Sequence, residues 1–339
     1  MQLNEIWFLI VGFLFIGYFV LDGFDFGVGM ALPFLGKDDT DRRVLINSIG
    51  PVWDLNETWV IVAGASLFAA FPEWYASLFS GFYLPLLLIL AALIARGVAF
   101  EYRGKGHTIG ADEKKWKARF DWMIVVGSAL PALLWGVAFA NIVEGVPLNK
   151  DHVFTGNLFT LLNPYGLLGG LVTLTLFFTH GLVFITLKTD GDIKDRARAL
   201  ATKVGIITTV LAATFLVWTL IAHFSVIGFI LTALAAVSLI AALLANHLKR
   251  EGISFSLLVF TIITAVGSLF AALFPNVFPS STNPAFSLTI DNASSSQYTL
   301  TVMTWVAVIM IPLVLLYQGW TYWVFRKRVS RKLIPAGSH

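Results

Sequence analysis

Residues 226–246, "VIGFILTALAAVSLIAALLAN", form an unbroken apolar run without a single charged side chain. The hydrocarbon core of a bilayer is about 30 Å thick, so an α-helix crosses it with roughly 20 apolar residues. A transmembrane strand needs only about ten residues and alternates between apolar and polar side chains. The run is too long and too continuous for a strand, and it therefore predicts a membrane-spanning helix.

The rest of the chain has the same character. Hydrophobic residues make up 57% of the 339 residues, charged residues only 13%, and the mean hydropathy is +0.80. These values are typical of an integral membrane protein and not of a water-soluble domain. The chain has no cysteine, which excludes disulfides and thiolate metal sites. A net charge of +3 does not indicate a nucleic-acid-binding surface, so we expect the lipid bilayer and no nucleic acid as a partner.

Nine segments are long and apolar enough to cross a bilayer as helices. We therefore expect an all-α integral membrane protein that forms one polytopic domain over residues 1–339. The predicted spans lie near residues 6–32, 50–71, 77–99, 121–143, 163–187, 204–222, 226–246, 254–274 and 300–325.

The basic residues indicate the orientation of these spans. All but two of the 23 lysines and arginines fall in the loops after the first, third, fifth and seventh spans or in the C-terminal segment. Cytoplasmic loops carry such an excess of positive charge. We expect the N-terminus outside, the C-terminus in the cytoplasm, and an odd number of spans.

Ionisable residues inside the first three spans are the strongest functional signal. Such residues are expensive in a membrane and commonly mark ion paths or proton relays. Asp22 and Asp25 fall in the inner half of the first span, and the second span opens with "VWDLNETW", residues 52–59. At about 1.5 Å per residue, three consecutive spans bring five groups to a similar level near the cytoplasmic face. These are Asp25, Asp54, Glu57, Arg96 and Glu101.

Two interpretations of this group remain open. Arg96 can pair with Asp25 or Asp54, and the acids of the second span can stabilise the N-terminus of that helix, which would make the group structural. Against this, one arginine cannot neutralise several carboxylates. The excess of acid favours groups that are protonated or hydrated, as a proton relay requires.

The histidines do not indicate a redox centre in this chain. Only His180 lies well inside a predicted span, and no second histidine sits at helical spacing from it. Haem also accepts methionine or tyrosine ligands, but the methionines are scattered. Trp53 and Trp59 flank the acids of the second span, where indoles anchor a helix at the membrane interface or pack against a cofactor of a neighbouring chain.

Long irregular motifs resemble subunit II of the cytochrome bd quinol oxidases across nearly the whole chain. They include "DGFDFGVG" (22–29), "RRVLINSIGPVWDLNETW" (42–59), "RGVAFEYR" (96–103), "LPALLWGVAFANIVEGVP" (130–147), "NPYGLLGGL" (163–171) and "YQGWTYWVFRKR" (317–328).

The resemblance implies a heterodimer in the bacterial plasma membrane that oxidises quinol and reduces oxygen to water. It implies two four-helix bundles plus one further helix, and haems b and d carried by subunit I and not by this chain. A small single-helix accessory subunit is a further possible partner.

The resemblance also implies roles for single residues. Asp54 matches an acid that delivers cytoplasmic protons toward the haems, and Asp25 and Arg96 match further positions important for the complex. Trp59 matches a tryptophan near an oxygen entry. Two rival functions remain: a proton-coupled secondary transporter, which would place its substrate site at the midplane beside broken helices, and a purely structural assembly subunit.

Overall fold

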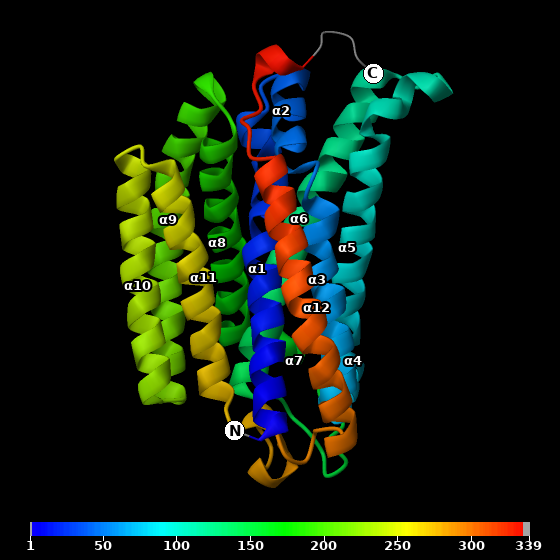
Figure 1. The fold of residues 1–339 in the computed structure, drawn as a ribbon, viewed down its shortest axis with the longest axis vertical. Helices are drawn as coiled ribbons and strands as arrows, with labels where there is room; N and C mark the ends of the chain where they lie inside the picture. The colour runs from blue at the N-terminus through cyan, green and yellow to red at the C-terminus, as the bar shows by residue number, and fades with distance from the viewer. Residues whose placement is uncertain (1, 335–339) are drawn as a thin grey trace.

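The structure, a computed structural model, describes residues 2–334 and is almost entirely helical (Figure 1). Within these residues, eight helices are long and apolar enough to cross a membrane. They are α1 (Leu3–Leu35), α5 (Tyr83–Tyr102, continued by the 3₁₀ helix η1, Arg103–Ile109), α6 (Glu113–Glu144), α8 (Pro164–Lys188), α9 (Gly191–Ala222), α10 (Val226–His247), α11 (Glu251–Leu273) and α12 (Gln297–Val324).

The predicted count of nine spans exceeds this number by one. The difference lies at α3 (Trp53–Ala70), which is helical as expected but shorter than the others. Because Asp54 and Glu57 occupy its first turns, its 18 residues are less apolar than the most apolar 18-residue stretch of each of the eight helices. The predicted third span also begins too early. Residues 77–81 belong to α4 (Pro72–Gly81), which starts at a proline in the first helical turn, a position that proline favours.

Several helices extend well beyond the predicted spans. α6 begins at Glu113 where residue 121 was predicted, and α9 begins at Gly191 where residue 204 was predicted. In both cases the extra turns are polar and basic, so a hydropathy pattern ends before the helix does. Helix starts coincide with capping side chains: Asp112, Asn163, Ser225 and Ser296 accept hydrogen bonds from the first free backbone N–H groups of α6, α8, α10 and α12.

α1 runs through the middle of the molecule, and α12 lies on the outside of the helical body (Figure 1). α1 approaches α8 so closely that a Cβ atom on Gly27 would lie 2.1 Å from the backbone oxygen of Phe177 and 2.7 Å from Cα of Gly181. Small residues permit this approach, as in other packed membrane helices. α12 is the opposite case, because only Leu300, Gln318 and Thr321 of its 28 residues are buried.

The short elements close the two ends of the helical body. At one end lie α7 (Leu158–Leu161), the two-stranded sheet β1 (Asn276–Phe278) and β2 (Leu288–Thr289), and the 3₁₀ helix η2 (Pro284–Phe286). Two of the loops carrying them are joined, since Val146 N–H donates to the Pro279 oxygen, and Asn4 at the start of α1 donates to Asp291 at 2.7 Å. At the other end lie α2 (Asp39–Ile49), η1 and the 3₁₀ helix η3 (Arg331–Leu333).

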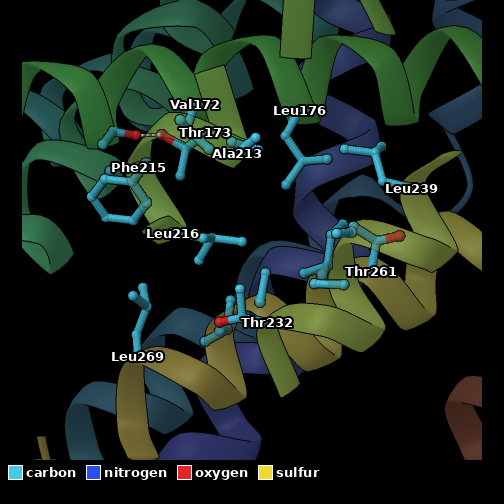
Figure 2. Close-up of a pocket in the computed structure, with 18 of the residues that line it drawn as sticks. Val172, Thr173, Leu176, Ala213, Phe215, Leu216, Thr232, Leu239, Thr261 and Leu269 are labelled. Carbon is cyan, nitrogen blue, oxygen red and sulfur yellow. Dashed lines mark hydrogen bonds between the residues drawn. The ribbon is translucent and has the colours of Figure 1, made fainter. Parts of the chain in front are cut away.

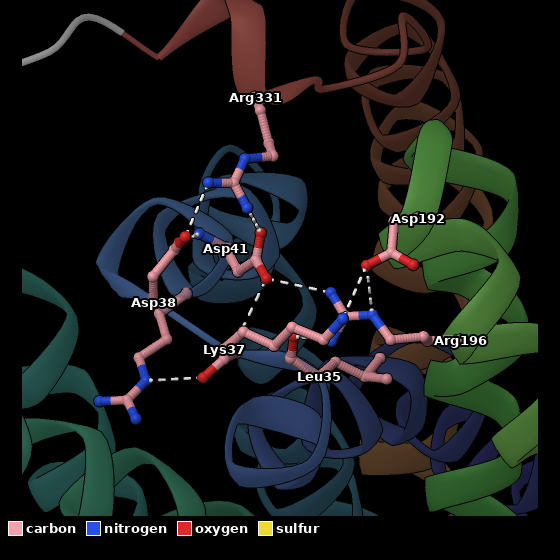
Figure 3. Close-up of polar contacts among 9 residues, drawn as sticks. Leu35, Lys37, Asp38, Asp41, Asp192, Arg196 and Arg331 are labelled. Atoms are coloured by element: carbon pink, nitrogen blue, oxygen red, sulfur yellow. Dashed lines mark hydrogen bonds and ion pairs between the residues drawn. The ribbon is translucent and has the colours of Figure 1, made fainter.

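Ion pairs fasten this second end (Figure 3). The buried carboxylate of Asp41 pairs with Arg196 at 3.0 Å and with Arg331 of η3, and Arg331 also binds Asp38 at 2.7 Å. Asp38 accepts a hydrogen bond from the Asp41 N–H, and this bond together with Arg331 lowers the pKa of Asp38 below its usual value. The C-terminal segment is thereby tied to α2 and α9.

A second group of ion pairs joins α2 to η1 and α6. Arg103 binds Asp121 at 2.6 Å and Asp39 at 2.7 Å. Partial burial acts to raise the pKa of Asp39, but the hydrogen bonds from Arg103 and Lys117 outweigh it and hold that pKa below its usual value. Both groups include basic residues of the segments that the sequence predicts to be cytoplasmic.

Candidate functional site

The centre of the candidate site is a buried arginine between carboxylates of two other helices. Arg96 comes from α5 and has no exposed surface, and neither has Asp22 of α1. Their closest atoms, Nη1 and Oδ1, are 3.4 Å apart. The rings of Phe26 and Phe100 cover the guanidinium, with centroids 5.0 and 5.2 Å from its Cζ atom. Aromatic walls thus exclude bulk water from most of the arginine.

Glu57 of α3 completes the ion-pair cluster and connects it to the surface. Its Oε2 lies 3.1 Å from Arg96 Nη1, and 21% of its side chain is exposed. Asp25 lies on α1 three residues after Asp22, which places both on one face of that helix, and it too is fully buried. One cation therefore faces three carboxylates, two of them fully enclosed.

This arrangement is not fully satisfied by protein groups. Within residues 2–334, Asp22 Oδ2, Asp25 Oδ1 and two guanidinium nitrogens of Arg96 have no hydrogen-bond partner. Buried polar atoms are paired in the great majority of cases, because each unpaired one costs about 1–3 kcal/mol. The surplus of acid and the unpaired oxygens leave the cluster able to accept protons or further hydrogen-bond donors.

Asp25 accepts a hydrogen bond from a side-chain amide of α3, and two residues of α12 bind that amide in turn. Asn56 Nδ2 donates to Asp25 Oδ2 at 2.7 Å. Asn56 Oδ1 accepts two hydrogen bonds from α12, from Gln318 Nε2 at 2.9 Å and from the Tyr322 hydroxyl at 2.7 Å. Sequence reasoning missed these three residues. Two uncharged polar residues four apart in the apolar α12 were the available signal.

The structure separates two predicted residues from this cluster. Asp54 lies on the exposed side of α3 and Glu101 on the exposed side near the end of α5, while Asp25, Glu57 and Arg96 lie together inside. The sequence suggested that Arg96 can pair with Asp25 or Asp54. In the structure its ion pairs are instead with Asp22 and Glu57. Depth along a helix follows from the sequence, but the direction in which a side chain points around the axis does not.

Trp59 is buried beside a groove between α1, α3 and α12. Its ring packs edge-on against Phe13, with centroids 5.9 Å apart, and a Cβ atom on Gly17 would lie 2.2 Å from it. The groove has a volume of about 370 Å³ and is lined almost wholly by apolar side chains, with Thr58, Tyr317 and Gln318 as the polar exceptions. It provides an apolar space within two residues of Glu57.

A second apolar cavity, of about 210 Å³, lies among the helices α6 and α8 to α11 (Figure 2). Leu176, Leu216, Leu239 and Leu269 point into it, and the hydroxyl of Thr173 is turned to the Ala132 oxygen at 2.6 Å. The cavity has no ionisable lining residue, so it takes no part in the charge cluster.

Comparison with known proteins identifies the family. The family model for cytochrome bd terminal oxidase subunit II matches residues 3–325. The chain belongs to this family. Similar relatives include cytochrome bd ubiquinol oxidase subunit 2 of Bacillus subtilis (strain 168), 43% identical over 336 residues, with 98% of each chain covered. Cytochrome bd-I ubiquinol oxidase subunit 2 of Escherichia coli (strain K12) is 40% identical, with 99% of this chain and 98% of the relative covered.

The fold agrees with this assignment. The structure of bd oxidase from Geobacillus thermodenitrificans superposes with a TM-score of 0.78, covering 96% of this chain and all of that chain at 17% identity. The predicted family is thus confirmed. As a cytochrome bd subunit II, this multi-pass membrane chain is one subunit of a respiratory oxidoreductase complex that uses oxygen, and it implies a subunit I.

Cytochrome bd complexes contain haem, and His180 is the one histidine of residues 2–334 that is fully buried. His180 Nε2 lies 3.1 Å from the Val20 oxygen, and its ring stacks on Phe255 at a centroid distance of 4.9 Å. Phe24 contacts the ring edge-on at 5.8 Å. One ring nitrogen thus bonds a carbonyl, as in many metal-bound histidines, whereas Nδ1 has no hydrogen-bond partner within residues 2–334 and two phenylalanines pack around the ring. No group of three or more His, Cys, Asp or Glu side chains that could hold a metal ion occurs among residues 2–334.

Proposed function

We propose that this chain is a haem-free subunit of a cytochrome bd-type quinol oxidase in the bacterial plasma membrane, where it supports a haem-bearing subunit I and supplies part of a cytoplasmic proton path. Protons consumed in the reduction of oxygen pass through the cluster around Arg96. The observation that carries the proposal is the surplus of carboxylates about one arginine inside the membrane, with Glu57 leading from the buried groups to the surface.

The residues have distinct roles in this proposal. Asp54 stands on the outer face of α3, one helical turn from Glu57, and is the group that transfers protons at the boundary with subunit I. Glu57 exchanges protons between that surface and the interior, and Asp25, Asp22 and Arg96 set the charge inside. Glu101, exposed near the end of α5, contributes a carboxylate at the entrance.

We propose nine membrane spans, with α3 as the ninth. Its 18 residues give a length of about 27 Å, close to the thickness of a bilayer core. α1, α3, α5 and α6 form one bundle, α8 to α11 form the second, and α12 is the additional helix. The ion pairs of α2, η1 and η3 gather basic loops at one end, which supports a cytoplasmic C-terminus and an outer N-terminus.

The groove beside Trp59 is the proposed route for oxygen toward the partner. Oxygen is apolar and partitions into apolar spaces, and the groove lies between α3 and the poorly buried α12. The rival transporter function receives no support from the helices at the site, because α1, α3 and α5 continue as helices through the residues of the cluster.

The test compares Asp25→Asn and Asp54→Asn in the intact complex, with Asp151→Asn in an exposed outer loop as the matched control. With normal haem spectra, we expect quinol-dependent oxygen consumption to fall about a hundredfold, the lower end of what a positioned proton-transfer group contributes. The control should leave turnover unchanged.

The alternatives give different results in the same experiment. Loss of haem from the purified complex in both site variants would support a purely structural subunit. Full haem content with unchanged turnover in both variants would exclude the proton path through these residues.

A further inference from the structure

A cavity of about 620 Å³ lies where α8 and α12 end, on the same side of the molecule as α2. Its volume is in the range of sites that bind small molecules, roughly 300–1,000 Å³. Ser48 and Phe255 contribute to its wall, together with Lys188 at the end of α8 and the basic segment that follows α12. The candidate proton site does not account for this cavity.

The wall is basic and contains no acid. Lys188, Arg326, Lys327 and Arg328 line the cavity, and no aspartate or glutamate is among its lining residues in the described part of the chain. This differs from the remainder of the same molecular end, where basic residues are engaged by Asp38, Asp39, Asp41 and Asp121. The cavity is therefore a place where positive charge is left without a protein counterion.

Hydrogen bonds hold the cationic groups at the cavity wall. Lys188 Nζ donates to the Lys327 oxygen at 3.1 Å and to the Phe325 oxygen, and Arg328 Nε donates to the Leu187 oxygen at 3.2 Å. These contacts use neutral carbonyl groups, so they fix the ammonium and guanidinium groups without neutralising them. Within residues 2–334, Lys327 has no ion-pair partner. The arrangement suits a ligand that brings its own negative charge.

Apart from Asn47 and Ser48, the rest of the wall is apolar or aromatic. Phe184, Phe255, Tyr322, Val324 and Phe325 face the same space as the basic residues. A free phosphate gains nothing from such a surface, whereas the glycerol backbone and the first acyl carbons of a phospholipid pack against it. The site also lies at the ends of two membrane-spanning helices, the level at which lipid headgroups meet a protein. Basic pockets at the cytoplasmic ends of membrane helices bind anionic headgroups.

We propose that this cavity binds one anionic phospholipid of the cytoplasmic leaflet, with its phosphodiester against Lys327 and Arg328 and its upper chain against Phe184 and Phe255. The assignment to the cytoplasmic leaflet rests on the proposed orientation of the chain, whereas the proposal that a lipid binds here does not.

The test measures lipid binding to the purified two-subunit complex by native mass spectrometry in detergent, with dioleoyl phosphatidylglycerol and dioleoyl phosphatidylcholine as probes. The site variant is Lys327→Gln/Arg328→Gln. The matched control is Lys114→Gln/Lys203→Gln, which removes two exposed lysines elsewhere on the chain. We expect one phosphatidylglycerol to bind the wild type tightly, about 30-fold weaker binding to the site variant, and no change in the control.

A second variant keeps the proposal testable if Lys327→Gln/Arg328→Gln fails to fold. Asn47→Asp places a negative charge at an exposed lining residue with almost no change in size, and it should also weaken phosphatidylglycerol binding. Equal binding of the two lipids to the wild type, or undiminished binding to both variants, would overturn the proposal. Displacement of the lipid by soluble glycerophosphoglycerol at the same concentration would assign the site to a free phosphate compound and overturn it as well. Because no step measures turnover, failure here leaves the proton path untouched.

Discussion

Replacing Arg96 with methionine removes the only cation of the buried cluster while keeping much of the side-chain volume. Arg96 pairs with Glu57 at 3.1 Å and with Asp22 at 3.4 Å. At an effective dielectric constant of about 20, each pair contributes an attraction of about 5 kcal/mol before desolvation is considered. The net effect is smaller, because a carboxylate deprived of its partner takes up a proton or turns toward water.

The exposure of each acid decides whether it takes up a proton or turns toward water. Glu57 is partly exposed and can turn toward solvent, whereas Asp22 is completely enclosed and must become neutral. An aspartate of ordinary acidity takes up a proton at pH 7 at a cost of about 4 kcal/mol. We therefore expect Arg96→Met to lower the free energy of unfolding by about 4 kcal/mol at pH 7, in line with other buried pairs that lose one partner.

The same reasoning fixes the sign of the pH dependence. The folded variant then holds a proton on Asp22 that the unfolded chain lacks above about pH 4. The deficit relative to the wild type should therefore grow by about 1.4 kcal/mol for each pH unit between pH 5 and 8. The double variant Asp22→Asn/Arg96→Met should recover part of the loss, because it removes the enclosed carboxylate that pairs with Arg96, while Asp25 keeps its hydrogen bond from Asn56.

Denaturant titration of the complex in mixed micelles, followed by tryptophan fluorescence, measures these differences. Arg119→Met is the matched control, since Arg119 is exposed and its loss should change stability by no more than about 0.5 kcal/mol. A loss below about 1 kcal/mol for Arg96→Met, or a loss that does not vary with pH, would refute the assignment of Arg96 and Asp22 as a buried ion pair.

Three further predictions concern the site, the contact between α1 and α8, and the ion pairs of Asp39. Tyr322→Phe removes a donor to the amide that holds Asp25 and should lower turnover about fivefold with normal haem spectra, measured as a pH profile of oxygen consumption; an unchanged profile would contradict this role. Gly27→Ala forces the backbones of α1 and α8 apart and should destabilise the complex by about 1–3 kcal/mol in the same denaturant titration. Gly64→Ala is the control, since a Cβ at residue 64 meets nothing within 4 Å, and it should be neutral or stabilising. Equal losses of stability in the two variants would contradict the close contact of α1 with α8 at Gly27. The pKa of Asp39 is lowered by its hydrogen bonds to Arg103 and Lys117, so its stabilising contribution is present above about pH 4 and lost as the pH falls further. Asp39→Asn should therefore lose less stability than the wild type between pH 5 and 3, and parallel losses would count against the ion pair.

Hydropathy located the membrane helices well and their ends poorly. A run such as residues 226–246 predicts its helix to within a residue or two, because burial in lipid depends on the local sequence alone. α9 begins 13 residues before its predicted span, because its polar first turns are stabilised by ion pairing, such as that of Asp192 with Arg196, and not by hydrophobicity. α3 shows the same limit, since two acids lower its hydropathy without ending the helix.

The sequence by itself determined the membrane class, the helical architecture, the basic end of the molecule and the presence of costly acids in the first spans, since each of these follows from residues close together in the chain. Only the tertiary structure decided that Asp22 and Glu57 face Arg96, that Asp54 and Glu101 face outward, and that Asn56 is held by residues about 260 positions away in α12. The physical reason is that depth in the membrane is set along one helix, whereas the direction of a side chain is set by how neighbouring helices pack and rotate against one another.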